Sequence, residues 1–280
     1  MKKVVDNPNK GLSFLYNNVV GRIILKLFVN NSFVTNIVGL YMKSSFSKIR
    51  IKKFIKDNNI NMDDYEQKKY KSFNDFFIRY IKPDKRIISK GKDDLISVCD
   101  SSLTYYKITD DLLFDVKKSK YSLKSILKNE KIANKYKDGD LLIFRLSPKD
   151  YHHYYFFDEG RVKNSYYIKG KYHTVNPIVY DKYEVFKENT RCITEISTKH
   201  FNDVLYIEVG ALCVGKIKNK ENVKTFKKMD EKGYFEFGGS TVILVFKKDI
   251  IRINDDILKL SKDGFEVSVK LGEKIGKIKK

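Results

Sequence analysis

From about Leu95 onward, the sequence consists of short runs of β-branched and aromatic residues separated by clusters of Gly, Asp, Asn and Lys. Such runs are typical of strands joined by turns. Helical spacing beyond residue 95 is limited to one short candidate at Tyr121–Ile132. The clearest strand candidates are residues 141–146, 165–168, 204–209, 211–217 and 241–246. We therefore expect a mostly antiparallel β body.

The first sixty residues have a different pattern. Apolar residues at positions 12, 15, 19, 20, 23, 24, 27 and 28 follow the spacing of an amphipathic helix, and the basic run 43–53 comes after them. Arg22 and Lys26 interrupt the apolar stretch, so it should not span a bilayer. The stripe suits a helix packed on a core or a helix lying on a membrane, and both alternatives stay open. A further short helix from Phe73 should end at Pro83.

The sequence thus predicts an α+β protein in which a helical, amphipathic N-terminal part precedes the antiparallel β body. We divide it into an amphipathic helical segment, residues 1–60, and a second part, residues 61–280. Apolar residues make up 42% of the chain, which excludes intrinsic disorder. The 56 Lys and Arg residues exceed the 35 Asp and Glu residues, which gives a net charge of +21. This surplus favours an anionic partner, either nucleic acid or a membrane surface.

Cysteine and histidine usage excludes several classes of protein. The three cysteines contain no C-x-x-C pair, which argues against a disulfide-stapled secreted scaffold and a cysteine zinc site. The N-terminus lacks the features of a signal peptide, so we expect a cytosolic chain. The four histidines are too scattered for a metal site, and we expect no metal. The common nucleotide-binding, zinc-protease and hydrolase motifs are missing.

One local sequence suggests chemistry. Gly238 and Gly239 precede Ser240 and Thr241, and a strongly apolar strand follows. The hydroxyl of Ser240 can reach the carbonyl of Gly239 and convert the peptide bond to an ester if the turn is strained. Elimination from that ester and hydrolysis would leave a pyruvoyl group. An ordinary hairpin turn is the simpler interpretation of these four residues taken alone.

Several ordered segments, taken together, resemble the phosphatidylserine decarboxylases, which are pyruvoyl enzymes that mature by such a serinolysis. The resemblance covers most of the chain. It rests on residues 73–83 (FNDFFIRYIKP), 97–100 (SVCD), 144–152 (FRLSPKDYH), 173–177 (HTVNP), 186–191 (FKENTR), 209–211 (VGA) and 233–241 (GYFEFGGST). The last segment carries the Gly-Gly-Ser-Thr cleavage motif of bacterial members.

The resemblance implies that cleavage between Gly239 and Ser240 yields a large subunit, residues 1–239, and a small subunit of 41 residues that stay associated. It implies a covalent pyruvoyl cofactor derived from Ser240, which forms a Schiff base with phosphatidylserine during decarboxylation to phosphatidylethanolamine. Its partners would be phosphatidylserine in an anionic membrane, with no nucleic acid, and family members are often homodimers. The protein would then act as a peripheral protein at the cytoplasmic face of the cell membrane.

The resemblance also implies roles for individual residues. Asp100 matches the aspartate that orients a histidine as general base for Ser240, although Ser101 stands where the family usually has glycine. His152 matches the histidine near the substrate carboxyl group.

A departure concerns the second family histidine, because Tyr155 occupies its position. Tyrosine is a poor base at neutral pH. His152 then serves maturation as well, or His153 or Tyr155 contributes, or self-cleavage is slow.

Three other residues lie in family blocks. His173 lines the site or has a structural role, and both interpretations stay open. Asn189 and Arg191 are weaker candidates, with Arg191 considered for contact with the substrate phosphate.

Two other function classes compete with the lipid decarboxylase. A non-catalytic basic protein that binds membrane or nucleic acid would keep the Gly-Gly-Ser-Thr turn intact. A pyruvoyl enzyme acting on a soluble amino acid would share the cleavage chemistry, but the amphipathic N-terminal part argues against it.

Overall fold

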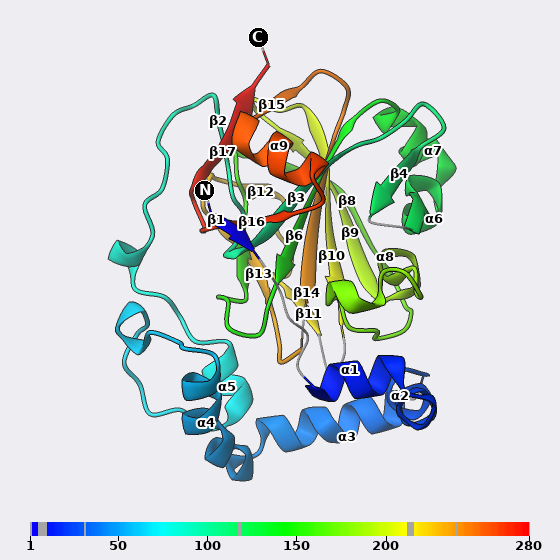
Figure 1. The fold of residues 1–280 in the computed structure, drawn as a ribbon. Coiled ribbons are helices and arrows are strands. Elements are labelled where there is room, and N and C mark those ends of the chain that lie inside the picture. The colour runs from blue at the N-terminus through cyan, green and yellow to red at the C-terminus, as the bar shows by residue number, and fades with distance from the viewer. Residues whose placement is uncertain are drawn as a thin grey trace.

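A computed structural model of the chain describes residues 2–4, 10–30, 32–116, 119–211, 216–238 and 240–279. It confirms the α+β class (Figure 1). A nine-stranded sheet forms the centre, and the ladders that build it are antiparallel. In spatial order its strands are β1 (Lys2–Val4), β16 (Glu266–Val269), β3 (Ser101–Lys107), β6 (Asp140–Leu146), β14 (Ser240–Phe246), β10 (Asp203–Gly210), β9 (Arg191–Thr198), β8 (Gly160–Ile168) and β12 (Thr225–Phe226).

Smaller sheets accompany the large one. They are β11 (Ile217–Asn219), β13 (Glu231–Phe235) and β7 (His153–Tyr155); β15 (Ile251–Ile253), β17 (Lys274–Ile278) and β2 (Asp94–Ile96); and the pair β4 (Leu113–Val116) and β5 (Ser119–Ser122). The helices are α1 (Lys10–Asn17), α2 (Val19–Asn30), α3 (Ser32–Lys43), α4 (Ile49–Asp57), α5 (Phe73–Phe77), α6 (Leu123–Leu127), α7 (Glu130–Ala133), α8 (Val185–Glu188) and α9 (Asp255–Lys262). Short 3₁₀ turns cover Ser45–Lys48, Met62–Asp64, Pro83–Lys85, Asn134–Tyr136 and Pro177–Val179.

The central strand β14 is buried on both faces, which explains its unbroken apolar sequence. Ile243 and Val245 point into one hydrophobic core, whereas Val242 and Leu244 point into the other. The two-residue period of a strand places Ser240 on the same face as Val242 and Leu244. Two smaller sheets and α9 cover this face, and β11–β13–β7 is the sheet at the end where β14, and so Ser240, begins (Figure 1).

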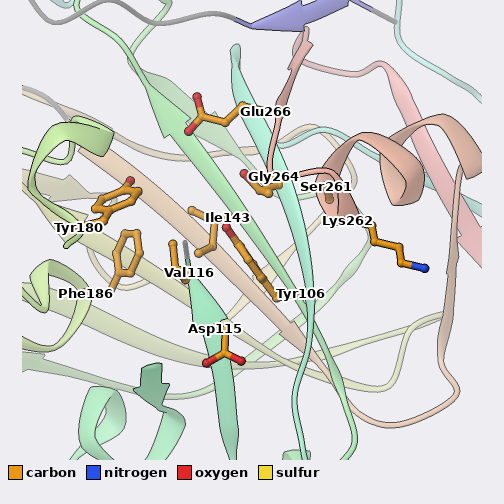
Figure 2. Close-up of a pocket in the computed structure, with 11 residues that line it drawn as sticks. Tyr106, Asp115, Val116, Ile143, Tyr180, Phe186, Ser261, Lys262, Gly264 and Glu266 are labelled. Carbon is orange, nitrogen blue, oxygen red and sulfur yellow. The ribbon is translucent and has the colours of Figure 1, made fainter. Parts of the chain in front are cut away.

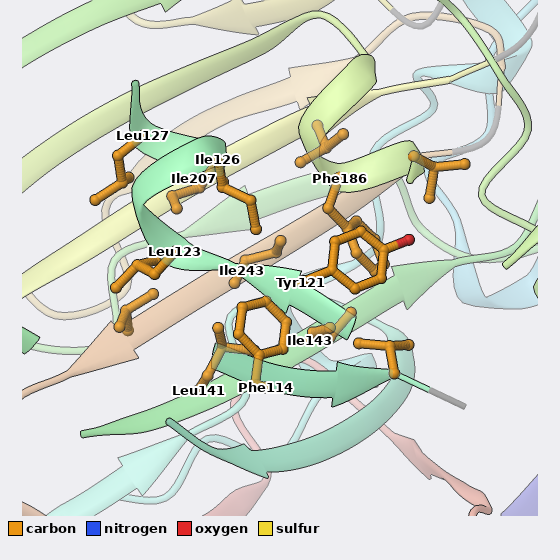
Figure 3. Close-up of a cluster of buried hydrophobic side chains, with 14 of the residues drawn as sticks. Phe114, Tyr121, Leu123, Ile126, Leu127, Leu141, Ile143, Phe186, Ile207 and Ile243 are labelled. Carbon is orange, nitrogen blue, oxygen red and sulfur yellow. The ribbon is translucent and has the colours of Figure 1, made fainter. Parts of the chain in front are cut away.

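The opposite face is covered by α6, α8 and the β4–β5 pair (Figure 3). Phe114 and Tyr121 from that pair stack at 5.7 Å between ring centroids. They pack over Ile143 and Ile243 of the sheet. Each large apolar side chain buried in this way contributes about 1.5–3 kcal/mol of transfer free energy.

Local residues explain where the expected helices break. The helix expected over Tyr121–Ile132 is wrong for its first two residues, which lie in β5. The rest forms two short helices, because Lys128 adopts a left-handed conformation (φ 48°) after α6 and the Asn129 side chain caps α7. The N-terminal amphipathic segment is likewise divided, since the Asn18 side chain accepts the N–H of Val20 at 2.9 Å. The N-terminal part also contributes β1, which pairs with β16 and was not expected.

The strand candidates 141–146, 165–168, 204–209 and 241–246 lie within β6, β8, β10 and β14. Most of the candidate at 211–217, with Cys213, lies outside the described residues. Helices α1, α2 and α3 lie beyond the end of the large sheet at which β14 begins (Figure 1). Among the helices that the structure describes, none is long and apolar enough to cross a membrane.

Candidate active site

Ser240 occupies the first position of β14, opposite Gly210 of β10 and Leu146 of β6. Its side chain is fully buried, and its Oγ has no hydrogen-bond partner within the described residues. Gly239, the other half of the expected cleavage site, lies outside those residues. A buried hydroxyl without a partner is costly, so Ser240 is marked as a functional candidate.

His152 lies at the layer that covers Ser240, since its carbonyl accepts the N–H of Phe235 in β13 at 3.0 Å. The imidazole is fully buried and packs on Phe77, with 4.1 Å between ring centroids. Its Nδ1 lies 2.9 Å from the carbonyl oxygen of Asp150. A carbonyl only accepts, so Nδ1 carries the proton and Nε2 has the free lone pair.

The protonation state of His152 follows from its surroundings. Burial, reinforced by the charge of Arg79, lowers the pKa of His152 from 6.5 to about 3. Nε2 has no hydrogen-bond partner in the described part of the chain. The side chain is therefore a neutral imidazole at physiological pH. Its free nitrogen can accept a proton, although the lowered pKa weakens it as a base.

Asp100 precedes β3 and is fully buried among positive groups. Its carboxylate accepts two hydrogen bonds from Arg86, contacts Lys270 Nζ at 3.3 Å and accepts the N–H of Leu271 at 2.9 Å. Burial raises the pKa of Asp100, but Arg86 and Lys270 outweigh it and hold the pKa below its ordinary value. Asp100 is thus ionised and paired with cations. Its expected role in orienting a histidine stays a prediction.

His153 and Tyr155 lie on the other side of β7 from the core residue Tyr154. Both ring nitrogens of His153 have partners. Nδ1 is hydrogen-bonded to Glu231, and Nε2 lies 3.1 Å from the carbonyl oxygen of Ile78. The Tyr155 hydroxyl lies 2.9 Å from that of Tyr151, and burial raises the pKa of Tyr155 to about 12. Of the residues considered as a maturation base, His152 has the suitable protonation state and a free nitrogen.

Tyr155→Phe is expected to leave self-cleavage within about twofold of the wild-type rate, because a phenol with a pKa near 12 accepts no proton at pH 7. The variant loses only the hydrogen bond to Tyr151, which costs about 1 kcal/mol of unfolding free energy. A time course of cleavage and a denaturant titration measure the two effects. A cleavage rate reduced by tenfold or more would show that Tyr155 takes part.

Asn189 connects the loop of His173 to the strand end opposite Ser240. Its side-chain amide donates to the carbonyls of His173 and Gly210, both at 2.8 Å, and its Oδ1 accepts the N–H of His173 at 3.0 Å. The His173 ring stacks on Tyr183 at 4.2 Å, and burial lowers the pKa of His173 to about 4. The backbone of this loop is therefore fixed relative to the site.

Arg191, which is buried, contacts the backbone of Asn189. Its guanidinium donates to the carbonyls of Ile126, Lys187 and Asn189 at 2.7–2.8 Å. These bonds fit a structural role, because one side chain satisfies three backbone carbonyl groups from different turns.

The segment before Ser240 is held by residues to which the motifs point only weakly or not at all. Asn74 of α5 accepts the N–H of Phe237 at 3.0 Å. The ring of Phe237 packs edge-on against Phe73 and Phe77, at 5.0 and 5.3 Å. Glu236 forms an ion pair of 2.7 Å with Lys43 of α3. The family block at residues 73–83 marks Asn74 as a candidate for a functional role. Its contact with Phe237 could not be predicted, because it depends on the tertiary fold.

A buried ion pair was also missed. Glu208 and Lys232 lie 2.6 Å apart, both almost fully buried, and Asn219 donates to Glu208 at 3.2 Å. Glu208 lies two residues before Gly210 and on the same face as Tyr206. The sequence signal was an acidic residue inside an otherwise apolar strand.

A separate cavity of about 190 Å³ lies on the far side of the large sheet (Figure 2). Ile143, Tyr180 and Phe186, which belong to the core away from Ser240, line it together with Glu266. It belongs to a different part of the molecule from Ser240 and His152.

Comparisons with known proteins agree with the motifs. Residues 73–277 match the family described as phosphatidylserine decarboxylase. The chain is 47% identical over 268 residues to phosphatidylserine decarboxylase proenzyme 2 of Clostridium acetobutylicum, covering 96% of this chain and 92% of the relative. It is 43% identical over 270 residues to the phosphatidylserine decarboxylase proenzyme of Clostridium novyi, covering 95% and 92%. It is 40% identical over 275 residues to that of Ruminiclostridium cellulolyticum, covering 95% and 90%. The chain therefore belongs to the phosphatidylserine decarboxylase family of enzymes.

Proposed function

We propose that the chain cleaves itself between Gly239 and Ser240 and then decarboxylates phosphatidylserine to phosphatidylethanolamine. The observation that carries the proposal is the combination of a buried Ser240 hydroxyl with a buried, neutral His152. Neither the hydroxyl nor His152 Nε2 has a hydrogen-bond partner among the described residues. Both groups lie where the β11–β13–β7 layer covers the beginning of β14. A hydroxyl and a neutral imidazole are the nucleophile and base that acyl transfer needs.

The proposed cleavage moves one proton at each stage. His152 accepts the Ser240 hydroxyl proton while Oγ bonds to the carbonyl carbon of Gly239, and the C–N bond breaks as the nitrogen of Ser240 takes up a proton. Loss of the α-proton of Ser240 then expels the Gly239 carboxylate from the ester and leaves a dehydroalanine. Water converts this group to pyruvoyl and releases ammonia.

The two subunits should remain joined after cleavage because the small one contributes β14 to the middle of the large sheet. β14 pairs with β6 on one side and with β10 on the other, and both of these belong to the large subunit. β14 is also buried on both faces. Separation would expose the edges and the faces of three central strands.

The Ser240 Oγ would leave with the Gly239 carboxylate, and the loss of this atom breaks no side-chain hydrogen bond to the described residues, so the site fits a pyruvoyl group. When formed, this group supplies an electron sink for loss of the carboxylate from an amino acid. His152 would then hold or move a proton at Nε2. The buried surroundings exclude water from the site.

The decarboxylation is tested by measuring CO2 released from phosphatidylserine labelled in its serine carboxyl group. We expect release from mixed micelles, and we expect phenylhydrazine, which reacts with ketones, to abolish it. An uncleaved protein that binds the lipid without releasing CO2 would support the non-catalytic alternative instead.

We further propose that residues 1–60 attach the catalytic domain, residues 61–280, to an anionic membrane at the cytoplasmic face. Among the described side chains of α2, Val19, Val20 and Ile23 lie exposed, whereas Tyr16 and Leu25 hold α1 and α2 to the β body. Exposed apolar residues continue through α3 into α4, namely Val19, Val20, Ile23, Ile37, Leu40, Phe46 and Ile49. Basic residues Lys48, Arg50, Lys52 and Lys53 lie among or beside them and suit anionic headgroups. A homodimer remains a prediction.

The triple variant Leu40→Ser, Phe46→Ser and Ile49→Ser is expected to bind phosphatidylserine vesicles at least about tenfold more weakly, because it removes three apolar contacts with the bilayer. These side chains are 70–83% exposed. Vesicle flotation measures the effect, and added salt should weaken the remaining binding. Ile87→Ser is the matched control, because Ile87 is 91% exposed outside this surface. Equal binding by the triple variant and the control would contradict the proposal.

A further inference from the structure

Arg79 is a buried cation that the proposed mechanism does not yet use. It follows α5, and only 1% of its surface is exposed. Its guanidinium lies over the rings of Tyr65 and Phe76, at 4.2 and 4.8 Å from their centroids. An arginine remains charged even when it is buried, so it retains a strong preference for an anion.

The hydrogen bonds of Arg79 leave much of that preference unmet. Nη2 reaches the Tyr65 hydroxyl and the Lys149 carbonyl at 3.2 Å, whereas Nη1 reaches the carbonyls of Phe76 and Phe77 at 3.5 Å. These acceptors are neutral and the bonds are long. Within the described residues, Nε has no hydrogen-bond partner.

Other buried cations of this chain are better satisfied. Arg86 pairs with Asp100, and Lys232 pairs with Glu208. Arg191, like Arg79, binds neutral groups, but it does so through three bonds of 2.7–2.8 Å. A buried charge left without a counter-ion is costly, and an incoming anion would remove that cost.

Arg79 belongs to the segment that joins the N-terminal helices to the candidate site. On the inner side, Phe77 packs against His152 at 4.1 Å, and the charge of Arg79 acts on His152. On the outer side, Phe76 and Phe77 belong to the cluster formed with residues of α3 and α4. The segment that carries Arg79 therefore contacts the N-terminal helices through Phe76 and Phe77 and contacts His152 through Phe77.

We propose that Arg79 binds the phosphodiester of the lipid headgroup, an assignment that rests on the proposed function. In phosphatidylserine the phosphodiester lies between the glycerol and the serine. This order fits a cation on the segment that contacts both the N-terminal helices and His152. The substrate carboxylate is the competing oxyanion. A permanent cation on the carboxylate would stabilise the ground state more than a transition state in which that charge is dispersing, and so would oppose decarboxylation.

The test compares kinetics of matured Arg79→Met and Arg79→Lys with those of the wild type. Two inhibitors show which of the two anionic groups Arg79 binds. Glycerophosphoethanolamine has the phosphodiester without a carboxylate, and L-serine has the carboxylate without a phosphate. We expect Arg79→Met to raise the KM for phosphatidylserine and the inhibition constant of glycerophosphoethanolamine by similar factors of about 10 to 100, with the inhibition constant of serine unchanged. Arg79→Lys should give smaller increases of both and serves if Arg79→Met does not fold or mature.

Arg191→Lys is the control for a buried arginine with neutral partners. It should lower the melting temperature but leave the KM for phosphatidylserine and the inhibition constant of glycerophosphoethanolamine unchanged. A raised KM with an unchanged glycerophosphoethanolamine constant would overturn the assignment in favour of the carboxylate. Unchanged constants for both Arg79 variants, in an active enzyme, would overturn it in favour of a structural role. An uncut and inactive wild-type chain would overturn the proposed function itself, and the assignment with it.

Discussion

Ser240→Ala is expected to give a folded, uncut chain of 280 residues that releases no CO2 from phosphatidylserine. The substitution removes the only atom that can attack the carbonyl of Gly239 in the proposed cleavage, so neither the ester nor the pyruvoyl group forms. It should not unfold the protein, because the missing Oγ makes no hydrogen bond within the described residues. Electrophoresis under denaturing conditions, a melting curve and a CO2-release assay measure the three outcomes.

Two further variants make this result specific. Ser240→Cys keeps a nucleophile at the same position and should cleave, at an altered rate. Thr241→Val removes the neighbouring buried hydroxyl, which points to the other face of β14, and should still cleave. Cleavage of the Ser240→Ala chain between residues 239 and 240 would refute serinolysis.

His152→Gln is expected to slow self-cleavage by about 10²- to 10⁴-fold, which is the usual contribution of a general base. In the wild type, the pKa of about 3 keeps His152 neutral at all pH values well above 3. The cleavage rate should therefore stay nearly constant from pH 5 to 8, without the inflection near 6.5 of an ordinary histidine. A cleavage time course at each pH measures both effects.

The same lowered pKa links His152 to stability. In the folded state His152 stays neutral down to about pH 3, whereas in the unfolded state it takes up a proton below about 6.5. Its contribution to stability is therefore complete above pH 6.5 and is lost as the pH falls, at up to about 1.4 kcal/mol per pH unit. Denaturant titrations should show this slope in the wild type and a shallower one in His152→Gln.

His200→Gln is the matched control, because His200 bonds Asp158 away from the core clusters and is partly exposed. It should leave the cleavage rate unchanged. A wild-type cleavage rate that follows a single pKa near 6.5, or a His152→Gln chain that matures normally, would show that another group is the base.

Patterns within short stretches of sequence predicted much of this fold. β14 is an unbroken apolar run because both of its faces are buried, and the Gly-Gly-Ser-Thr motif placed Ser240 at its beginning. Breaks within the helices were harder to foresee. They depend on single residues, such as Asn18 as a cap and Lys128 in a left-handed conformation, which are common in helices as well.

The partners of the site residues could not be predicted, because they come from distant parts of the chain. Asp100 meets Lys270 and Leu271 through the sheet arrangement, and Asn74 meets Phe237 across 163 positions. The orphaned atoms of Arg79 and His152 become visible only once burial is known. Local patterns thus locate the nucleophile, whereas tertiary contacts decide which groups surround it.

The most direct test of the account is the intact mass of the purified protein under denaturing conditions. We predict two chains, a large one ending at Gly239 and a small one of 41 residues. The small chain should be lighter than a serine-terminated fragment by the mass of ammonia, because a pyruvoyl group replaces its N-terminal serine. A single uncut chain, or a small fragment that still begins with serine, would contradict the account.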